Sequence, residues 1–92
     1  MKPSNKRIEE IKINKNQVFN LTFSSKQISK IDILVKVLPK SFRQSERGSG
    51  YCFLRNERDY SFSVRGYRRA NDLITYFVSQ IPRIKWECYE NS

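Results

Sequence analysis

The hydrophobic pattern changes its period at Ser24, and this change restricts the fold more than any other feature of the sequence. Before Ser24, the apolar residues Phe19, Leu21 and Phe23 alternate with other residues, which is typical of a strand with one buried face. After it, apolar residues recur at steps of three and four through residues 28–38, which predicts a helix with one buried stripe. The chain therefore joins a strand directly to a helix.

The residues at the ends of this helix mark its limits. Ser24 and Gln27 have the spacing of a capping box, and Pro39 cannot continue a helix. We therefore expect the helix at residues 25–38.

A weaker strand pattern precedes the first clear strand. Residues 7–13 alternate in part, and residues 14–16 are typical of a turn. A three-residue loop would set Ile11 opposite Phe19 and form a hairpin with one apolar face.

The same order of elements then recurs, because a second strand pair precedes a second helix. We expect strands at residues 51–55 and 60–65, joined by a turn at residues 56–59. In this register Arg55 pairs with Tyr60, and the faces are set by two further pairs, Phe53 with Phe62 and Tyr51 with Val64.

The second helix has helical spacing of apolar residues from about Arg68 to Ile81, and Pro82 ends it. The last residues are ambiguous, since Ile84, Trp86 and Cys88 alternate as in a strand but also suit a short amphipathic helix.

Two such units predict an α+β fold, a ββαββα two-layer domain in which a four-stranded antiparallel sheet carries two helices on one face. A chain of 92 residues has the length of one domain, so we assign residues 1–92 to it and expect residues 1–7 to be a flexible basic arm. The second face of the sheet stays open.

The formal net charge of +9 favours an anionic partner, and nucleic acid is the leading one. Nine of the cations lie between Lys36 and Arg69, where only Glu46, Glu57 and Asp59 oppose them. Arginine suits phosphate oxygens and guanine edges, and short polar side chains on strands can enter a major groove. The predicted nucleic-acid-binding residues on the open face and in its loops are Asn20, Thr22, Lys40, Arg43, Arg47, Arg55, Arg58, Ser61, Ser63, Arg65, Arg68 and Arg69.

Residues 17–86 resemble a half-domain of the LAGLIDADG homing endonucleases. The resemblance lies in three segments, Val18-Phe19-Asn20-Leu21-Thr22-Phe23 with the helix after it, Tyr60-Ser61-Phe62-Ser63-Val64-Arg65, and Asn71-Asp72-Leu73-Ile74-Thr75-Tyr76-Phe77 closed by Ile81-Pro82. It implies a saddle-shaped sheet that grips a DNA groove, and it favours duplex DNA over RNA.

The family's defining helix, with its small residues and its metal-binding acid, has no counterpart before Ile8. The family's cleavage chemistry therefore transfers to no residue here, and we expect a non-catalytic binder with no cofactor and no metal. The family works as a two-fold pair, so a homodimer through another surface stays open.

Three other functions stay open for this chain. The aromatics Tyr51, Phe53, Tyr60, Phe62 and Tyr67 could stack single-stranded bases, although packing against the helices is favoured for most of them. Without histidine, a ribonuclease toxin would depend on Tyr60, Arg65, Tyr67, Arg68 and Arg69. A small inhibitor or adaptor of viral or mobile-element origin could instead dock on an acidic protein.

The remaining chemistry-bearing residues point to no further site. Cys52 and Cys88 have no metal-ligand or CxxC spacing, so we expect reduced thiols. The carboxylate pairs Glu9 with Glu10 and Glu57 with Asp59 are expected in solvent. No secretory signal, membrane span or membrane partner is predicted, which favours an intracellular location in the cytoplasm, nucleoid or an organelle matrix.

Overall fold

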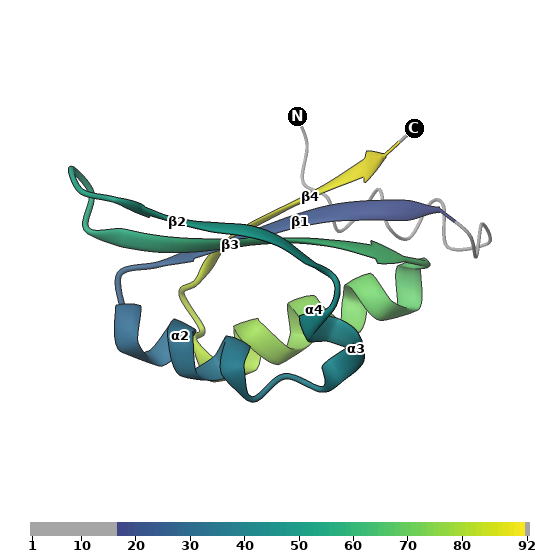
Figure 1. The fold of residues 1–92 in the computed structure, drawn as a ribbon, viewed down its shortest axis with the longest axis horizontal. Helices are drawn as coiled ribbons and strands as arrows, with labels where there is room; N and C mark the ends of the chain where they lie inside the picture. Colours follow the sequence, from purple (N-terminus) through teal and green to yellow (C-terminus); the bar gives the residue numbers. More distant parts are fainter. Residues whose placement is uncertain (1–16, 92) are drawn as a thin grey trace.

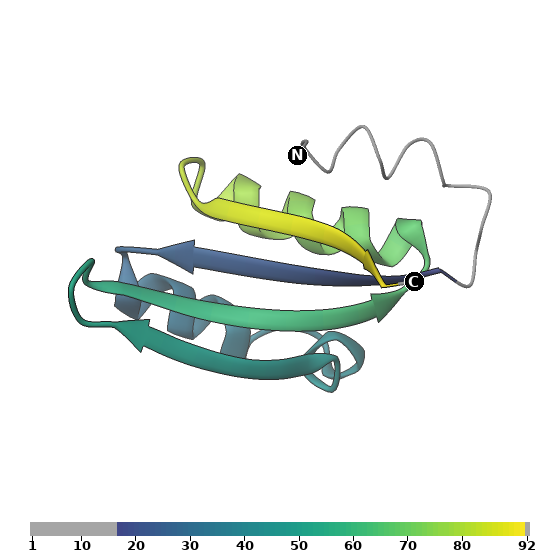
Figure 2. The same cartoon turned by 90° about the horizontal axis from the view of Figure 1, so that it is seen from above.

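The computed structural model describes residues 17–91, which form one antiparallel sheet with helices on one face (Figure 1). Its strands lie in the order β2-β3-β1-β4, and Figure 2 shows them side by side. This confirms the predicted α+β class with its four-stranded sheet. The elements are β1 (Val18–Ser25), α2 (Ile28–Lys36), α3 (Lys40–Arg43), β2 (Glu46–Cys52), β3 (Glu57–Arg65), α4 (Tyr67–Gln80) and β4 (Lys85–Asn91).

The order of the elements differs from the expected ββαββα. Apart from the short α3, it is the βαββαβ order of the ferredoxin-like, split βαβ arrangement. β1 is paired along one edge by β3 and along the other by β4. The alternation of Ile84, Trp86 and Cys88 therefore belongs to a strand, as one of the two interpretations predicted. The expected strand at residues 7–13, its turn and the arm at residues 1–7 lie outside the described residues.

The core lies between the sheet and the helices and is built by the two predicted periodicities. Phe19, Leu21 and Phe23 of β1 have no exposed surface, and Phe77 of α4 is equally buried. The rings of Phe23 and Phe77 stack with centroids 4.3 Å apart, and Phe62 of β3 meets the edge of Phe23 at 6.0 Å. Aromatic packing of this kind fixes α4 under β1 and β3.

The first helix begins later than predicted, because β1 is longer. Ser24 and Ser25 still pair with β3, so Ser24 is a strand residue and makes no capping box. The backbone N–H of Gln27 instead donates to Oγ of Ser25 at 2.9 Å, and α2 starts at Ile28. The helix ends shortly before Pro39, as expected.

The predicted register of the second hairpin is wrong, because the turn lies three residues earlier. Residues 53–56 form the turn, and Cys52 pairs with Glu57 rather than Arg55 with Tyr60. β2 begins at Glu46, within a polar segment and five residues before the expected start of this strand at Tyr51. Asn56 closes the turn with φ of 53°, a left-handed conformation that asparagine tolerates better than most residues.

A tight turn at Gly66 connects β3 to α4. Gly66 has φ of 90° and is buried, and its N–H donates to the carbonyl of Gln17 at 2.7 Å. Glycine reaches this conformation without the steric penalty that a Cβ would bring. α4 then starts at Tyr67, close to the predicted position.

Candidate nucleic-acid interface

The polar residues predicted for the open face do lie together on the side of the sheet away from the helices. They alternate with the buried residues of β1 and β3, so their side chains point to the other face. Asn20 lies opposite Ser63 and Thr22 opposite Ser61, and the Ser63 hydroxyl donates to Oδ1 of Asn20 at 2.6 Å. Arg65 continues the row beside Val18.

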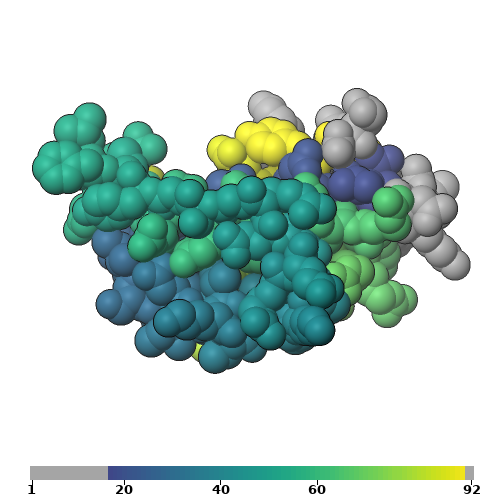
Figure 3. Space-filling view, in the orientation of Figure 1, coloured from purple at the N-terminus to yellow at the C-terminus, as the bar shows by residue number. Residues whose placement is uncertain are grey.

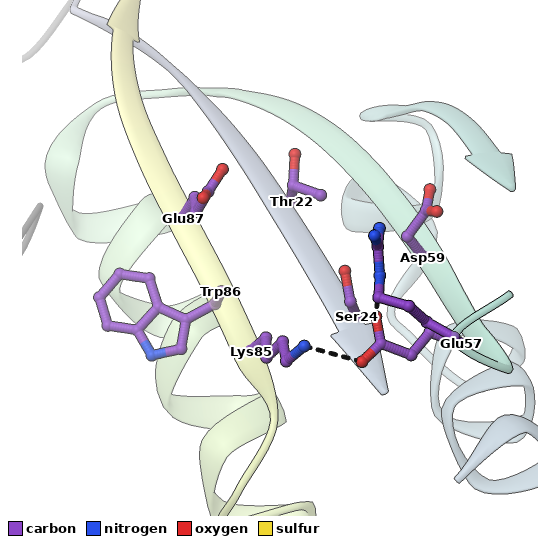
Figure 4. Close-up of a pocket in the computed structure, with 8 residues that line it drawn as sticks. Thr22, Ser24, Glu57, Asp59, Lys85, Trp86 and Glu87 are labelled. Carbon is purple, nitrogen blue, oxygen red and sulfur yellow. Dashed lines mark hydrogen bonds and ion pairs between the residues drawn. The ribbon is translucent and has the colours of Figure 1, made fainter. Parts of the chain in front are cut away.

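The open face is mixed in charge rather than basic, which corrects the expectation of a basic sheet face. Near the hairpin it holds a shallow pocket with three carboxylates and two cations (Figure 4). The pocket is lined by Thr22, Ser24, Arg55, Glu57, Asp59, Lys85, Trp86 and Glu87. Glu57 and Asp59 reach this face because the register shift places both in β3 instead of in a turn.

The carboxylate of Glu57 is buried and paired, although it was expected to lie in solvent. It is 5% exposed, and Lys85 Nζ and Arg55 Nε lie 2.8 Å and 3.4 Å from its carboxylate oxygens. The hydrogen bond from Lys85 holds the pKa of Glu57 below its ordinary value, although burial acts in the opposite direction. Arg55 therefore supports β3 and β4 from the turn, and part of its charge is compensated.

Arg58 lies on the opposite side of the sheet from the other predicted strand residues. Its Nε is 3.1 Å from Oδ1 of Asp32 on α2, and the Tyr60 hydroxyl donates to the same oxygen at 2.5 Å. Burial, followed by this bond to Asp32, raises the pKa of Tyr60 to about 12. Arg58 thus fastens α2 to β3, and it does not share a surface with Arg65.

Four of the predicted cations belong to α3 and to the first turn of α4, which contact each other. The guanidinium of Arg69 lies 4.3 Å from the centroid of the Phe42 ring, and its nitrogens donate to Ser41. This contact joins the two helices, and we name the cations that they carry here the basic end: Lys40, Arg43, Arg68 and Arg69. Lys40, Arg43 and Arg68 are exposed.

Two further predicted cations belong to strands that start or stop near the basic end. Arg65 is the last residue of β3, directly before the turn into α4. Arg47 lies in the bulge near the start of β2, a type of irregularity that turns a side chain away from the regular alternation.

Sequence reasoning missed an exposed apolar feature at the turn between β2 and β3. Phe53 is 81% exposed and Leu54 is 91% exposed, whereas both were placed within a strand. The signal that could have found them is Asn56, since a residue suited to a left-handed turn lies two positions after Leu54.

The two other nucleic-acid interpretations fare differently. Phe62 is a core residue and Tyr60 packs on the core, as expected for aromatics that are not a stacking platform, but Tyr51 and Phe53 are exposed. The ribonuclease residues are not brought together, because Tyr60 lies on the helix side and Arg65 on the open face.

Neither thiol belongs to a metal site among residues 17–91, where no cluster of three or more suitable ligands occurs. Cys88 is buried, and burial raises its pKa to about 12, while Cys52 is half-buried. No helix in this part of the chain is long and apolar enough to span a bilayer.

Comparison of the chain with protein-family models, with curated proteins and with solved structures gives no match.

Proposed function

We propose that this chain is a non-catalytic nucleic-acid-binding protein and that the basic end contacts the phosphate backbone. The observation that carries the proposal is the contact of Arg69 with Phe42 and Ser41, because it joins α3 to the first turn of α4, and these two segments carry four cations. Arginine and lysine at this spacing can meet successive phosphates, and each contact releases condensed counterions.

The charge at the basic end is compensated less than that of Arg55 and Arg58. These two arginines have carboxylate partners, whereas Arg69 contacts a ring, a hydroxyl and a backbone carbonyl, and Arg43 donates to the backbone carbonyl of Leu38. The nearest acid along α4 is Asp72, one turn after Arg69. A surface that keeps its positive charge attracts an anionic polymer over a distance of about a Debye length.

Duplex DNA is the partner we favour, and the resemblance to a LAGLIDADG half-domain supports that choice over RNA. The resemblance itself stays a hypothesis: it depended on two hairpin and helix units, of which residues 17–91 contain one, β2-β3-α4. We propose no cleavage, because no residue of the chain matches the family's metal-binding acid.

The test compares two double variants of equal charge by fluorescence anisotropy on labelled duplex DNA, single-stranded DNA and structured RNA. Lys40→Gln with Arg68→Gln removes two exposed cations from the basic end. Lys30→Gln with Arg83→Gln removes two exposed cations from α2 and from the segment before β4 and serves as the control.

At about 0.1 M salt we expect the basic-end variant to bind duplex about tenfold more weakly, from somewhat under 1 kcal/mol per screened contact. The control should stay within about twofold of wild type. Equal losses in both variants would show that net charge alone matters, and no binding of any probe by wild type would leave an acidic protein as the partner.

A further inference from the structure

The turn between β2 and β3, residues 53–56, presents two large apolar side chains to solvent, and we name it the hairpin tip. Phe53 and Leu54 are the most exposed large apolar residues described, and Tyr51 beside them is 48% exposed. Figure 3 shows the tip standing out from the body of the molecule, at the left of the view. Large apolar side chains are normally buried in the core, and an exposed group of them often marks an interaction site.

The hairpin tip is held in one conformation by polar contacts to its backbone and base. Lys26 Nζ donates to the carbonyl oxygen of Arg55 at 2.6 Å, and the Tyr51 hydroxyl donates to Oδ1 of Asn56 at 2.6 Å. Below them, Glu57 joins Arg55 to Lys85 of β4. The two apolar side chains are thus presented by an ordered turn, which lowers the entropic cost of inserting them into a partner.

The charge around the hairpin tip selects an anionic partner. Lys26 and Arg55 flank the apolar pair, and the side chain of Arg55 is 67% exposed. A second copy of this chain carries the same positive charge and would be repelled. Of the three carboxylates in the nearby pocket, Glu57 is buried and paired with Lys85, and Asp59 and Glu87 lie in the strands below the turn.

The shape of the hairpin tip separates nucleic acid from a membrane surface. Only two large apolar side chains project from the turn, since Cys52 before it is small and Arg55 and Asn56 within it are polar. A stable membrane anchor needs far more apolar area than two side chains supply, whereas one or two apolar residues suffice to open a base step.

The position of the hairpin tip agrees with the surface proposed above. β2 is an edge strand that runs from the region after α3 to the tip, which curves toward the open face of the sheet (Figure 1). The described part of the molecule is 37 Å long, which corresponds to about eleven base pairs at ~3.4 Å each. α3 lies at the start of β2 and the tip at its end, so a duplex laid along this edge of the sheet would meet both.

We propose that the hairpin tip is a wedge: Phe53 and Leu54 insert between stacked bases of the nucleic acid that the basic end holds, and they kink it. This inference rests on the proposed function. Apolar wedges of this kind unstack a base step and bend the duplex by roughly 20–90°.

The experiment uses the full chain and a duplex of about 25 base pairs with a donor and an acceptor dye on its ends. Binding is followed by anisotropy and bending by energy transfer. The tip variant is Phe53→Ala with Leu54→Ala, and its matched control is Ile33→Ala with Val37→Ala, a second exposed apolar pair, on and just after α2. Thermal unfolding of both variants verifies that the fold is intact, as their exposure leads us to expect.

Wild type and the control should increase energy transfer on binding. The tip variant should bind about tenfold more weakly, keep the salt dependence of wild type and lose the bend. Binding and bending equal to wild type in the tip variant, or an unbent duplex in the wild-type complex, would overturn the wedge while the proposed function stands.

Two other outcomes overturn the wedge in different ways. No binding of duplex by wild type would overturn the proposed function and the wedge with it. Tip-dependent binding to vesicles with 30% anionic lipid, together with duplex binding that ignores the tip, would assign the tip to membranes instead.

Discussion

The thiol of Cys88 should be protected from reagents in the folded protein, and this protection tests the placement of β4. Cys88 is 5% exposed and lies opposite Leu21 of β1, and burial, more than the charge of Glu90, raises its pKa to about 12. An ordinary thiol, with a pKa of about 8.5, is about one-quarter ionised at pH 8. A pKa of about 12 leaves about one thiol in 10,000 as the reactive thiolate, so the thiolate fraction falls roughly 2500-fold, and steric protection slows the reaction further.

Ellman's reagent at pH 8 measures this difference on wild type and on the variant Cys52→Ser. Folded wild type should release one equivalent readily, from the half-buried Cys52, and the second only in urea. The variant should react only when it unfolds. If Cys88 in the folded variant reacts at the rate of a model thiol, it is not buried between β1 and the helices, and the assignment of the fourth strand fails.

Three further predictions concern the core, the buried ion pair and the turn into α4. Phe77→Ala should lower the free energy of unfolding by about 3–5 kcal/mol in urea titrations, because Phe77 is fully buried and stacks on Phe23; a loss below about 1 kcal/mol would contradict this packing. Glu57→Gln should lower the thermal midpoint at pH 7. Since the folded pKa of Glu57 lies below its ordinary value of 4.5, its contribution is present above that pH and is lost as pH falls further. The difference between wild type and variant should therefore shrink below about pH 4.5, and a difference that does not change between pH 7 and 3 would argue against the ion pair. Gly66→Ala should cost about 1–3 kcal/mol because φ is 90° there, whereas Gly48→Ala, with open space around the new Cβ, should stay within about 0.5 kcal/mol; equal stabilities would refute the strained turn.

The sequence was sufficient for the parts of the fold that depend on local periodicity. Two such patterns are the alternation of Phe19, Leu21 and Phe23 and the helical spacing that ends near Pro39. Each marks the face of a strand or helix that is buried against the neighbouring layer. Such patterns are visible within ten or fifteen residues, so a single sequence contains them.

The register of the hairpin could not be found in the same way, because distant residues decide it. The polar run 56–59 has the composition of a turn, but Lys85, 28 residues away, pairs with Glu57 and makes it a buried strand residue. The position of the fourth strand depends likewise on pairing between β1 and β4, which are far apart in the chain. Neither contact has a local signature.

Strand alternation predicted where some of the candidate residues lie on the fold, but not where the others lie. The polar row of Asn20, Thr22, Ser61 and Ser63 follows from strand alternation and lies on the open face. Charge alone, however, does not reveal that Asp32 on α2 engages Arg58, or that Phe42 and Ser41 bring Arg69 to α3. Because of these contacts, the cations that were predicted to form one basic surface lie in separate parts of the fold.

The salt dependence of duplex binding tests the central claim, that the basic end holds the phosphate backbone. For B-DNA the slope of log K against log salt is about −0.9 per phosphate contact, so we predict that Lys40→Gln with Arg68→Gln makes the slope shallower by about 2. The control, Lys30→Gln with Arg83→Gln, should keep the wild-type slope. A basic-end variant whose slope equals that of wild type between about 50 and 200 mM salt would contradict the account, because those cations would then contact no phosphate.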